Sequence, residues 1–174
     1  QSQTDLSGAN GWKSFTEMFT IANFCADWVV LRNAGFLPDN FWGNDKDIDI
    51  LCRDLASFIL AVNARRRGNG PSSFEAKVES KYVDLDARYL TDDYYDVLWQ
   101  HDMLYTKKMH GIVPILNLEN HFFALLYHAK VHKLAMKSTY VPLLVQMAEQ
   151  LGLNLKQSVL NDNKSCGTFL DVYL

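Results

Sequence analysis

The chain has 174 residues, of which 48% are hydrophobic and 21% are charged. These values are typical of a globular domain with its own core, and they exclude an intrinsically disordered chain. The 17 basic and 20 acidic residues give a net charge of -3, which argues against general electrostatic attraction to nucleic acid or to an anionic membrane.

The cysteines and the distribution of apolar residues indicate a compartment. Cys25, Cys52 and Cys166 are odd in number and widely separated, which fits reduced thiols better than a disulfide framework or a zinc knuckle. No stretch approaches the roughly 20 consecutive apolar residues of a membrane-spanning helix, and the first residues lack a secretion-signal pattern. We therefore expect a cytoplasmic protein without a membrane span.

The first elements predicted along the chain are a helix and a buried strand. Apolar residues recur at near-helical spacing over residues 12–25, where Ser14 or Thr16 can cap the start. A continuous apolar run over residues 28–32 predicts a buried strand. Residues 33–45 are rich in glycine, asparagine and proline, and they predict a long loop.

Two further strands and a helix follow. Residues 47–52 alternate between polar and apolar, which predicts a half-buried strand. Residues 53–66 place their apolar side chains on one helical face, and the arginine- and glycine-rich segment 65–73 predicts a mobile loop. Residues 75–90 alternate over a long span and predict one continuous third strand.

The second half of the chain is predicted to be mostly helical, after a short aromatic helix and a hairpin. The predicted elements are a helix at 94–104, a hairpin or paired strand at 107–116, a helix at 118–133 capped by Asn117, and a helix at 139–152 capped by Ser138. This order predicts an α+β fold in a single domain, residues 1–174, with an α/β core to about residue 116 and a helical part beyond it.

Two of the predicted strands carry pairs of aspartates. Alternate residues of a strand share a face, so Asp47 and Asp49 point the same way, as do Asp84 and Asp86. Mg²⁺ prefers hard oxygen ligands and usually takes one or two protein carboxylates, completing its shell with phosphates and water. Like charges on neighbouring strands repel unless a cation or basic side chains intervene. The pattern predicts a metal site, with a solvated sheet face as the alternative.

The order of these motifs resembles the nucleotidyltransferase superfamily, in which a strand and a turn precede a D-x-D strand and a later strand adds a third aspartate. More narrowly, the chain is similar to nucleotidyltransferase-like domains associated with bacterial and viral surface-polysaccharide assembly. The matching segments are WVVLRNAGFLPDNFWGNDKDIDILC, VDLDARYLTDDYYDVLW and NHFFALLYHAKVHK. The resemblance covers residues 26–140 and implies a small mixed sheet flanked by helices.

The resemblance also implies roles for the acidic residues. Asp47 and Asp49 match the paired metal-binding aspartates, and Asp86 best matches the third carboxylate, with Asp84 as the second choice. As a set they are the expected catalytic and metal-binding residues, and the implied cofactor is Mg²⁺ or Mn²⁺.

The chain departs from the superfamily at the turn before the D-x-D strand. A Gly-Ser pair would meet the triphosphate there, whereas this chain has LRNAG, with Arg32 and Asn33 in the turn. Arg32 can bind a phosphate through two hydrogen bonds and Asn33 can donate another, which would replace the backbone cradle. The alternative is that Arg32 is an ion-pair partner of Asp47.

The helix predicted over residues 118–133 carries histidines and lysines. His121, His128 and His132 fall on one stripe of an ideal helix. We expect His128, His132 and Lys133 to line a cleft opposite the aspartates and to hold phosphate or a sugar hydroxyl. Zinc is a weaker alternative, because no glutamate follows the first histidine and no third ligand is evident. Ordinary packed or exposed histidines are the other alternative.

These features predict a divalent-metal-dependent, nucleotidyltransferase-like transferase that acts on a nucleotide or nucleotide-sugar in surface-polysaccharide or glycoconjugate biosynthesis. Two alternatives stay open. A D-x-D glycosyltransferase would use the same acidic pair, but its doubly wound nucleotide-binding unit needs more strands before that motif. A non-catalytic domain would bind a nucleotide or a partner enzyme within a larger polypeptide.

Overall fold

The computed structural model describes residues 6–172, and the chain divides into two compact units, Gln1–Leu116 and Asn117–Leu174. The predicted α+β class is confirmed, because helices accompany a seven-stranded mixed sheet. Within the described residues, no helix combines the length and the apolar composition needed to cross a membrane.

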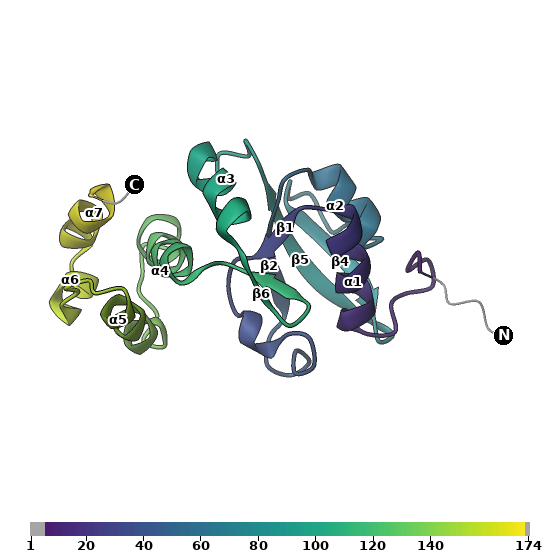
Figure 1. The fold of residues 1–174 in the computed structure, drawn as a ribbon, viewed down its shortest axis with the longest axis horizontal. Coiled ribbons are helices and arrows are strands. Elements are labelled where there is room, and N and C mark those ends of the chain that lie inside the picture. Colours follow the sequence, from purple (N-terminus) through teal and green to yellow (C-terminus); the bar gives the residue numbers. More distant parts are fainter. Residues whose placement is uncertain (1–5, 173–174) are drawn as a thin grey trace. The chain divides into compact units, whose positions relative to one another are not determined.

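The sheet of the amino-terminal unit has the strand order β3-β4-β5-β2-β1-β7-β6, which places β2 at its centre (Figure 1). Strands β2 and β5 pair in parallel, as do β1 and β7, and the other neighbours are antiparallel. The strands are β1 (Trp28–Val30), β2 (Asp47–Cys52), β3 (Arg65–Arg66), β4 (Ser73–Val78), β5 (Lys81–Tyr89), β6 (Lys108–His110) and β7 (Val113–Ile115).

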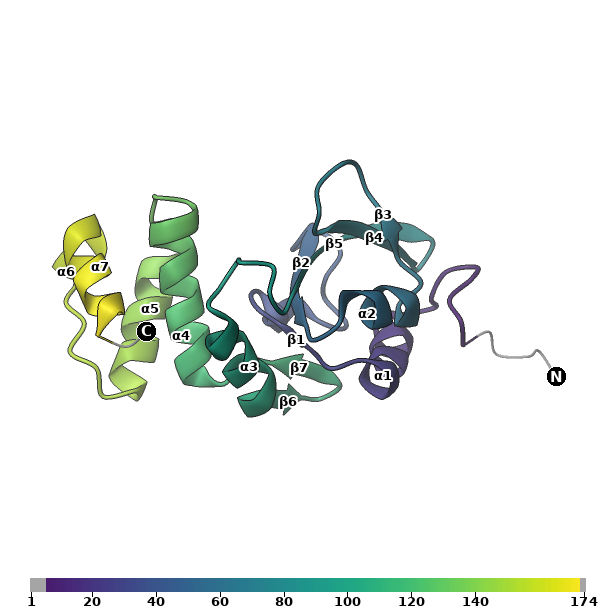
Figure 2. The same cartoon turned by 90° about the horizontal axis from the view of Figure 1, so that it is seen from above.

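Helices α1 (Phe15–Cys25) and α2 (Leu55–Ala61) lie side by side against the sheet (Figures 1 and 2). Helix α1 begins at Ser14, whose hydroxyl accepts a hydrogen bond from the Glu17 backbone N–H at 3.1 Å. This bond satisfies one of the amide groups that the first helical turn leaves unpaired. A 3₁₀ turn, η1 (Ala34–Phe36), precedes β2, and α3 (Val97–Thr106) contacts β1 and β2.

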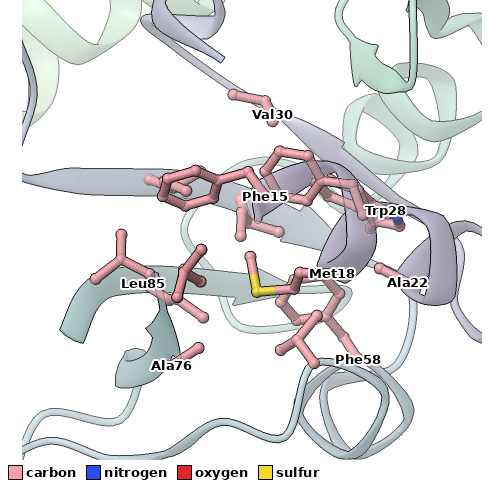
Figure 3. Packing of buried hydrophobic residues seen from close by; sticks show 14 of the residues in the cluster. Phe15, Met18, Ala22, Trp28, Val30, Phe58, Ala76 and Leu85 are labelled. Atoms are coloured by element: carbon pink, nitrogen blue, oxygen red, sulfur yellow. The ribbon is translucent and has the colours of Figure 1, made fainter. Parts of the chain in front are cut away.

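One apolar core joins these helices to the sheet. Side chains of α1 and α2 meet the inward-facing residues of β1, β2, β4 and β5, and Figure 3 shows several of them pointing toward one another. Phe19 packs against Trp28 with ring centroids 5.2 Å apart, and Trp28 packs against Phe58 at 5.5 Å. Aromatic pairs at such distances stabilise a core beyond the effect of their buried area. The labelled residues are Phe15, Met18, Ala22, Trp28, Val30, Phe58, Ala76 and Leu85.

Two predicted elements of this unit are confirmed only in part. The helix expected over residues 53–66 ends at Ala61, and Arg65–Arg66 form an edge strand instead. The long strand expected over residues 75–90 is a hairpin, because Glu79 and Ser80 adopt positive φ angles of 51° and 66°. Two consecutive left-handed residues make a tight hairpin turn whose usual Asn-Gly signature is absent here.

The carboxyl-terminal unit consists of helices. Its elements are α4 (Leu118–Tyr127), the π-helical turn η2 (His128–His132), α5 (Tyr140–Gln150), α6 (Gln157–Asn161) and α7 (Asn163–Asp171). The predicted cap at Asn117 is confirmed, since its side chain accepts from the Asn120 N–H at 2.8 Å. The predicted cap at Ser138 was wrong: α5 follows Thr139, which makes no capping side-chain bond.

Candidate functional site

The two acidic pairs lie side by side on adjacent strands. In the parallel β2–β5 pair, Asp47 is opposite Asp84 and Asp49 is opposite Asp86. The residues that alternate with them on both strands are buried in the core, so the four carboxylates share the other face of the sheet. Charges of the same sign this close on neighbouring strands destabilise a sheet unless they are compensated.

The negative charge of Asp49 is compensated by Arg32, which follows β1. The guanidinium donates through Nε to Oδ2 at 3.1 Å and through Nη2 to Oδ1 at 2.5 Å. Both side chains are largely buried, with 6% of Arg32 and 13% of Asp49 exposed. Burial raises the pKa of Asp49 and Arg32 lowers it, while Asp47 and Asp86 raise it further, so the net shift is upward. Arg32 is thus an ion-pair partner of the D-x-D motif, through Asp49 rather than Asp47.

Asp47 is more exposed and differs from Asp49 in its partners. Among residues 6–172 it makes no ion pair. Its pKa is raised by partial burial and by the neighbouring Asp45 carboxylate, against a lowering influence of Arg32. The carboxylates of Asp84 and Asp86 raise this pKa further. Asp47 therefore lies where a cation would relieve repulsion.

The aspartates of β5 pair with arginines of their own sheet. Arg67, just after β3, forms an ion pair with Asp84. Arg88, two residues along β5 on the same face, places Nε 3.2 Å from Oδ1 of Asp86, and its guanidinium carbon lies 3.9 Å from the centre of the Tyr94 ring. Three of the four carboxylates thus have a basic partner.

An open pocket of about 430 Å³ lies over this part of the β2–β5 pair. Its lining combines three carboxylates with two cations and two hydroxyl groups. Asp49, held against Arg32, does not line it. The lining residues are Lys46, Asp47, Arg67, Ser72, Ser73, Asp84, Leu85 and Asp86.

The donor set of the pocket suits a hard divalent cation, because Asp47, Asp84 and Asp86 offer carboxylate oxygens from adjacent strands. Within the described residues, however, no three acidic, histidine or cysteine side chains are already gathered around one metal position. The arginine pairs explain this, since they draw the carboxylates of Asp84 and Asp86 toward themselves. A metal ion would therefore compete with arginines for its ligands.

Comparisons with known proteins leave the family open. Protein-family models, curated proteins and solved structures give no significant match. The nucleotidyltransferase-like nature of the fold therefore stays a prediction. The structure shows a mixed sheet in which the acidic residues lie on the neighbouring strands β2 and β5.

The remaining predicted site residues lie elsewhere. Asn33 adopts a left-handed conformation, with φ of 57°, at the start of η1 and makes no capping side-chain bond. His128, His132 and Lys133 belong to the carboxyl-terminal unit, where His128 is buried and Lys133 is exposed. Their predicted role alongside the aspartates of the other unit stays a prediction.

The helix expected to carry three histidines on one stripe changes its geometry at His128. The Lys133 N–H donates to the His128 carbonyl five residues earlier, at 3.0 Å, which marks a π-helical turn. This turn has more residues than an α-helical turn, so the offset of eleven from His121 to His132, which crosses it, no longer has the ideal α-helical spacing. The rings of His128 and His132 nevertheless lie near each other, with centroids 6.0 Å apart.

Sequence reasoning assigned no basic partner to Asp84 or Asp86. Arg88 had a usable signal, because it continues the period of two set by Asp84 and Asp86. Arg67 had none, because its segment was assigned to a mobile loop. Its partner depends on how β3 and β4 pair.

Proposed function

We propose that this chain is a divalent-metal-dependent, nucleotidyltransferase-like transferase that acts on a nucleotide or nucleotide-sugar in surface-polysaccharide or glycoconjugate biosynthesis. The observation that carries the proposal is the in-register pairing of D47-x-D49 with D84-x-D86 on parallel neighbouring strands. The pocket over these residues supports the proposal. Its basic side chains can bind the phosphates of a ligand, and its carboxylates can bind the accompanying cation.

Each residue has a role in this proposal. Asp47 and Asp49 hold the Mg²⁺ or Mn²⁺ ion, and Asp86 completes the site or accepts the proton of the attacking hydroxyl, with Asp84 as the alternative third ligand. The ion neutralises phosphate charge and lowers the pKa of an attacking oxygen when bound. Arg32 orients the Asp49 carboxylate through its two hydrogen bonds.

A specific observation favours a second candidate, a non-catalytic nucleotide-binding domain of a larger protein. Arginines already pair with Asp49, Asp84 and Asp86, which is how a sheet would neutralise acidic residues without any metal. The glycosyltransferase alternative gains no such support. Only β1 precedes β2 among the described residues, and the sheet is mixed rather than doubly wound.

Isothermal titration calorimetry tests the proposal, using Mg²⁺ or Mn²⁺ with a panel of nucleotides and nucleotide-sugars. We expect metal-dependent binding that Asp47→Asn abolishes. The matched control is Asp39→Asn, an exposed aspartate before the 41–46 loop, which should bind as the wild type does. Binding that needs no metal and survives Asp47→Asn would favour the non-catalytic candidate.

Product analysis separates the two enzymatic possibilities. Release of diphosphate from a nucleoside triphosphate indicates nucleotidyl transfer. Release of a nucleoside diphosphate from a nucleotide-sugar indicates glycosyl transfer. No turnover with any donor, despite metal-dependent binding, would contradict the enzymatic part of the proposal.

A further inference from the structure

The lining of the acidic pocket includes two basic residues, which come from two loops. Arg67 lies at the end of the β3 edge strand, and Lys46 lies just before β2. Ser72 and Ser73, at the start of β4, add hydroxyl groups to the same lining. The pocket therefore presents cations and hydroxyl groups together with the carboxylates of β2 and β5.

The three consecutive arginines of this segment have different environments. Arg65 donates from Nε to Glu75 Oε1 at 2.7 Å and lies over the Tyr82 ring, 4.6 Å from its centre. Arg66 lies over the Phe74 ring at 5.2 Å and donates to a loop carbonyl. Of the three, Arg67 is the one that lines the pocket, with 54% of its side chain exposed.

The charges of the pocket suit a metal and a phosphate together better than either alone. A phosphate chain by itself would be repelled by the carboxylates of Asp47, Asp84 and Asp86. A divalent cation that takes Asp84 as a ligand would by itself separate Arg67 from Asp84 and leave that guanidinium without its partner. When both bind, the cation takes the carboxylate and the phosphate takes the guanidinium.

We propose that Arg67 exchanges its partner on ligand binding, leaving Asp84 for a phosphate of the incoming metal–phosphate ligand, and that Lys46 binds the same phosphate chain. The proposal rests on the metal-dependent function proposed above and names the residues that recognise the phosphates. Lys46 makes no ion pair with any residue between 6 and 172, so its ammonium group can bind phosphate without breaking one. A planar guanidinium binds phosphate through two parallel hydrogen bonds.

Calorimetry on the full chain tests this exchange with two probes, Mg²⁺ alone and inorganic pyrophosphate at saturating Mg²⁺. Pyrophosphate carries the phosphate chain without a base or a sugar, so it isolates the phosphate contacts. We expect wild-type protein to bind pyrophosphate about 10-fold more tightly with Mg²⁺ than without it.

Arg67→Gln should change the two affinities in opposite directions. Mg²⁺ alone should bind several-fold more tightly, because Asp84 is released from its ion pair. Pyrophosphate with Mg²⁺ should bind about 10-fold more weakly, which is the loss of one charge-assisted contact. A variant with both affinities unchanged, or with both weakened, would overturn the exchange.

One further variant serves as a matched control and another tests the second phosphate contact, and circular dichroism checks that each is folded. Arg66→Gln removes the neighbouring arginine that stacks on Phe74, and it should leave both affinities at their wild-type values. Lys46→Gln should weaken pyrophosphate binding and leave Mg²⁺ binding unchanged. An effect of Arg66→Gln equal to that of Arg67→Gln would contradict the assignment, because it would reflect only the net charge.

Asp47→Asn distinguishes this inference from the proposed function. If Asp47→Asn abolishes Mg²⁺ binding but Arg67→Gln leaves both affinities unchanged, the metal site stands and the exchange fails. If wild-type protein binds no Mg²⁺ with or without pyrophosphate, the proposed function fails and the exchange fails with it.

Discussion

Asp47 and Asp49 are two residues apart on one strand, yet they have different electrostatic environments. Asp49 is nearly buried and is held by two hydrogen bonds from Arg32. Asp47 is exposed to solvent and close to other carboxylates. Both pKa values are raised, in each case by burial first. Because burial and the neighbouring carboxylates both favour the protonated form, ionisation of each residue is less favourable in the folded than in the unfolded state.

The raised pKa of Asp47 predicts how Asp47→Asn changes stability with pH. A carboxyl with a raised folded-state pKa favours the folded state at low pH, and this contribution is lost as the pH rises through that pKa. The variant should match the wild type in acid and should be more stable at pH 7 by about 0.5 kcal/mol, a small value because the group is exposed. Urea denaturation at pH 3, below the ordinary pKa of the carboxyl, and at pH 7 measures both differences. A variant less stable than the wild type at pH 7 would contradict the repulsion.

The Arg32–Asp49 pair predicts a larger effect. Arg32→Gln leaves the buried Asp49 carboxylate without its charged partner, and we expect the free energy of unfolding to fall by about 3 kcal/mol. The double variant Arg32→Gln with Asp49→Asn should recover most of this loss, because neither buried charge remains. Urea denaturation of the wild type, the two single variants and the double variant gives the coupling free energy. Equal losses in Arg32→Gln and in the double variant would mean that the pair contributes through packing alone.

At the scale of elements, the start of α1 shows how one side chain fixes a helix boundary. The sequence allowed either Ser14 or Thr16 as the cap, and the structure assigns Ser14. We expect Ser14→Ala to cost about 1 kcal/mol of unfolding free energy, because the Glu17 N–H loses its acceptor. Thr16→Ala, two residues later on the exposed face, should change it by less than about 0.5 kcal/mol. Thermal denaturation compares the two, and equal losses would contradict the assigned cap.

Local pattern was enough to predict some elements and not others. Strand β2 was predicted at its observed bounds, because alternation of Asp47 and Asp49 with buried isoleucines is a signal within six residues. The hairpin between β4 and β5 was missed, because Glu79 and Ser80 turn the chain without glycine or asparagine. Strand β3 was missed because an edge strand of two residues is defined by its pairing with β4.

The candidate site divides in the same way. The sequence predicted that Asp47 and Asp49 share one face of their strand and that Asp84 and Asp86 share one face of theirs, because alternate residues of a strand point the same way. That those two faces are one surface depends on the parallel pairing of β2 with β5, which only the fold supplies. The partners of the aspartates depend on it too, since Arg32 and Arg67 approach from separate segments of the chain.

For the whole molecule, the two units differ in what they contain. The core cluster draws its members from residues 12–115, and all seven strands lie before residue 116. The acidic pocket is likewise built within the amino-terminal unit. A fragment of residues 1–116 therefore keeps this core, the sheet and the pocket. We expect it to unfold cooperatively in urea, and a broad transition without a baseline would contradict its independence.

The same fragment tests the predicted role of His128, His132 and Lys133, which it lacks. If these residues hold the ligand, the fragment should bind Mg²⁺ as the full chain does but pyrophosphate with Mg²⁺ about 10-fold more weakly. Calorimetry on the full-length variant Lys133→Gln separates this residue from the rest of the carboxyl-terminal unit. Lys130→Gln is an unsuitable control because Lys130 is buried, whereas Lys137 is exposed and nearby, so Lys137→Gln is the matched one. Equal pyrophosphate affinities of the fragment and the full chain would confine phosphate recognition to the amino-terminal unit, where Arg67 and Lys46 lie.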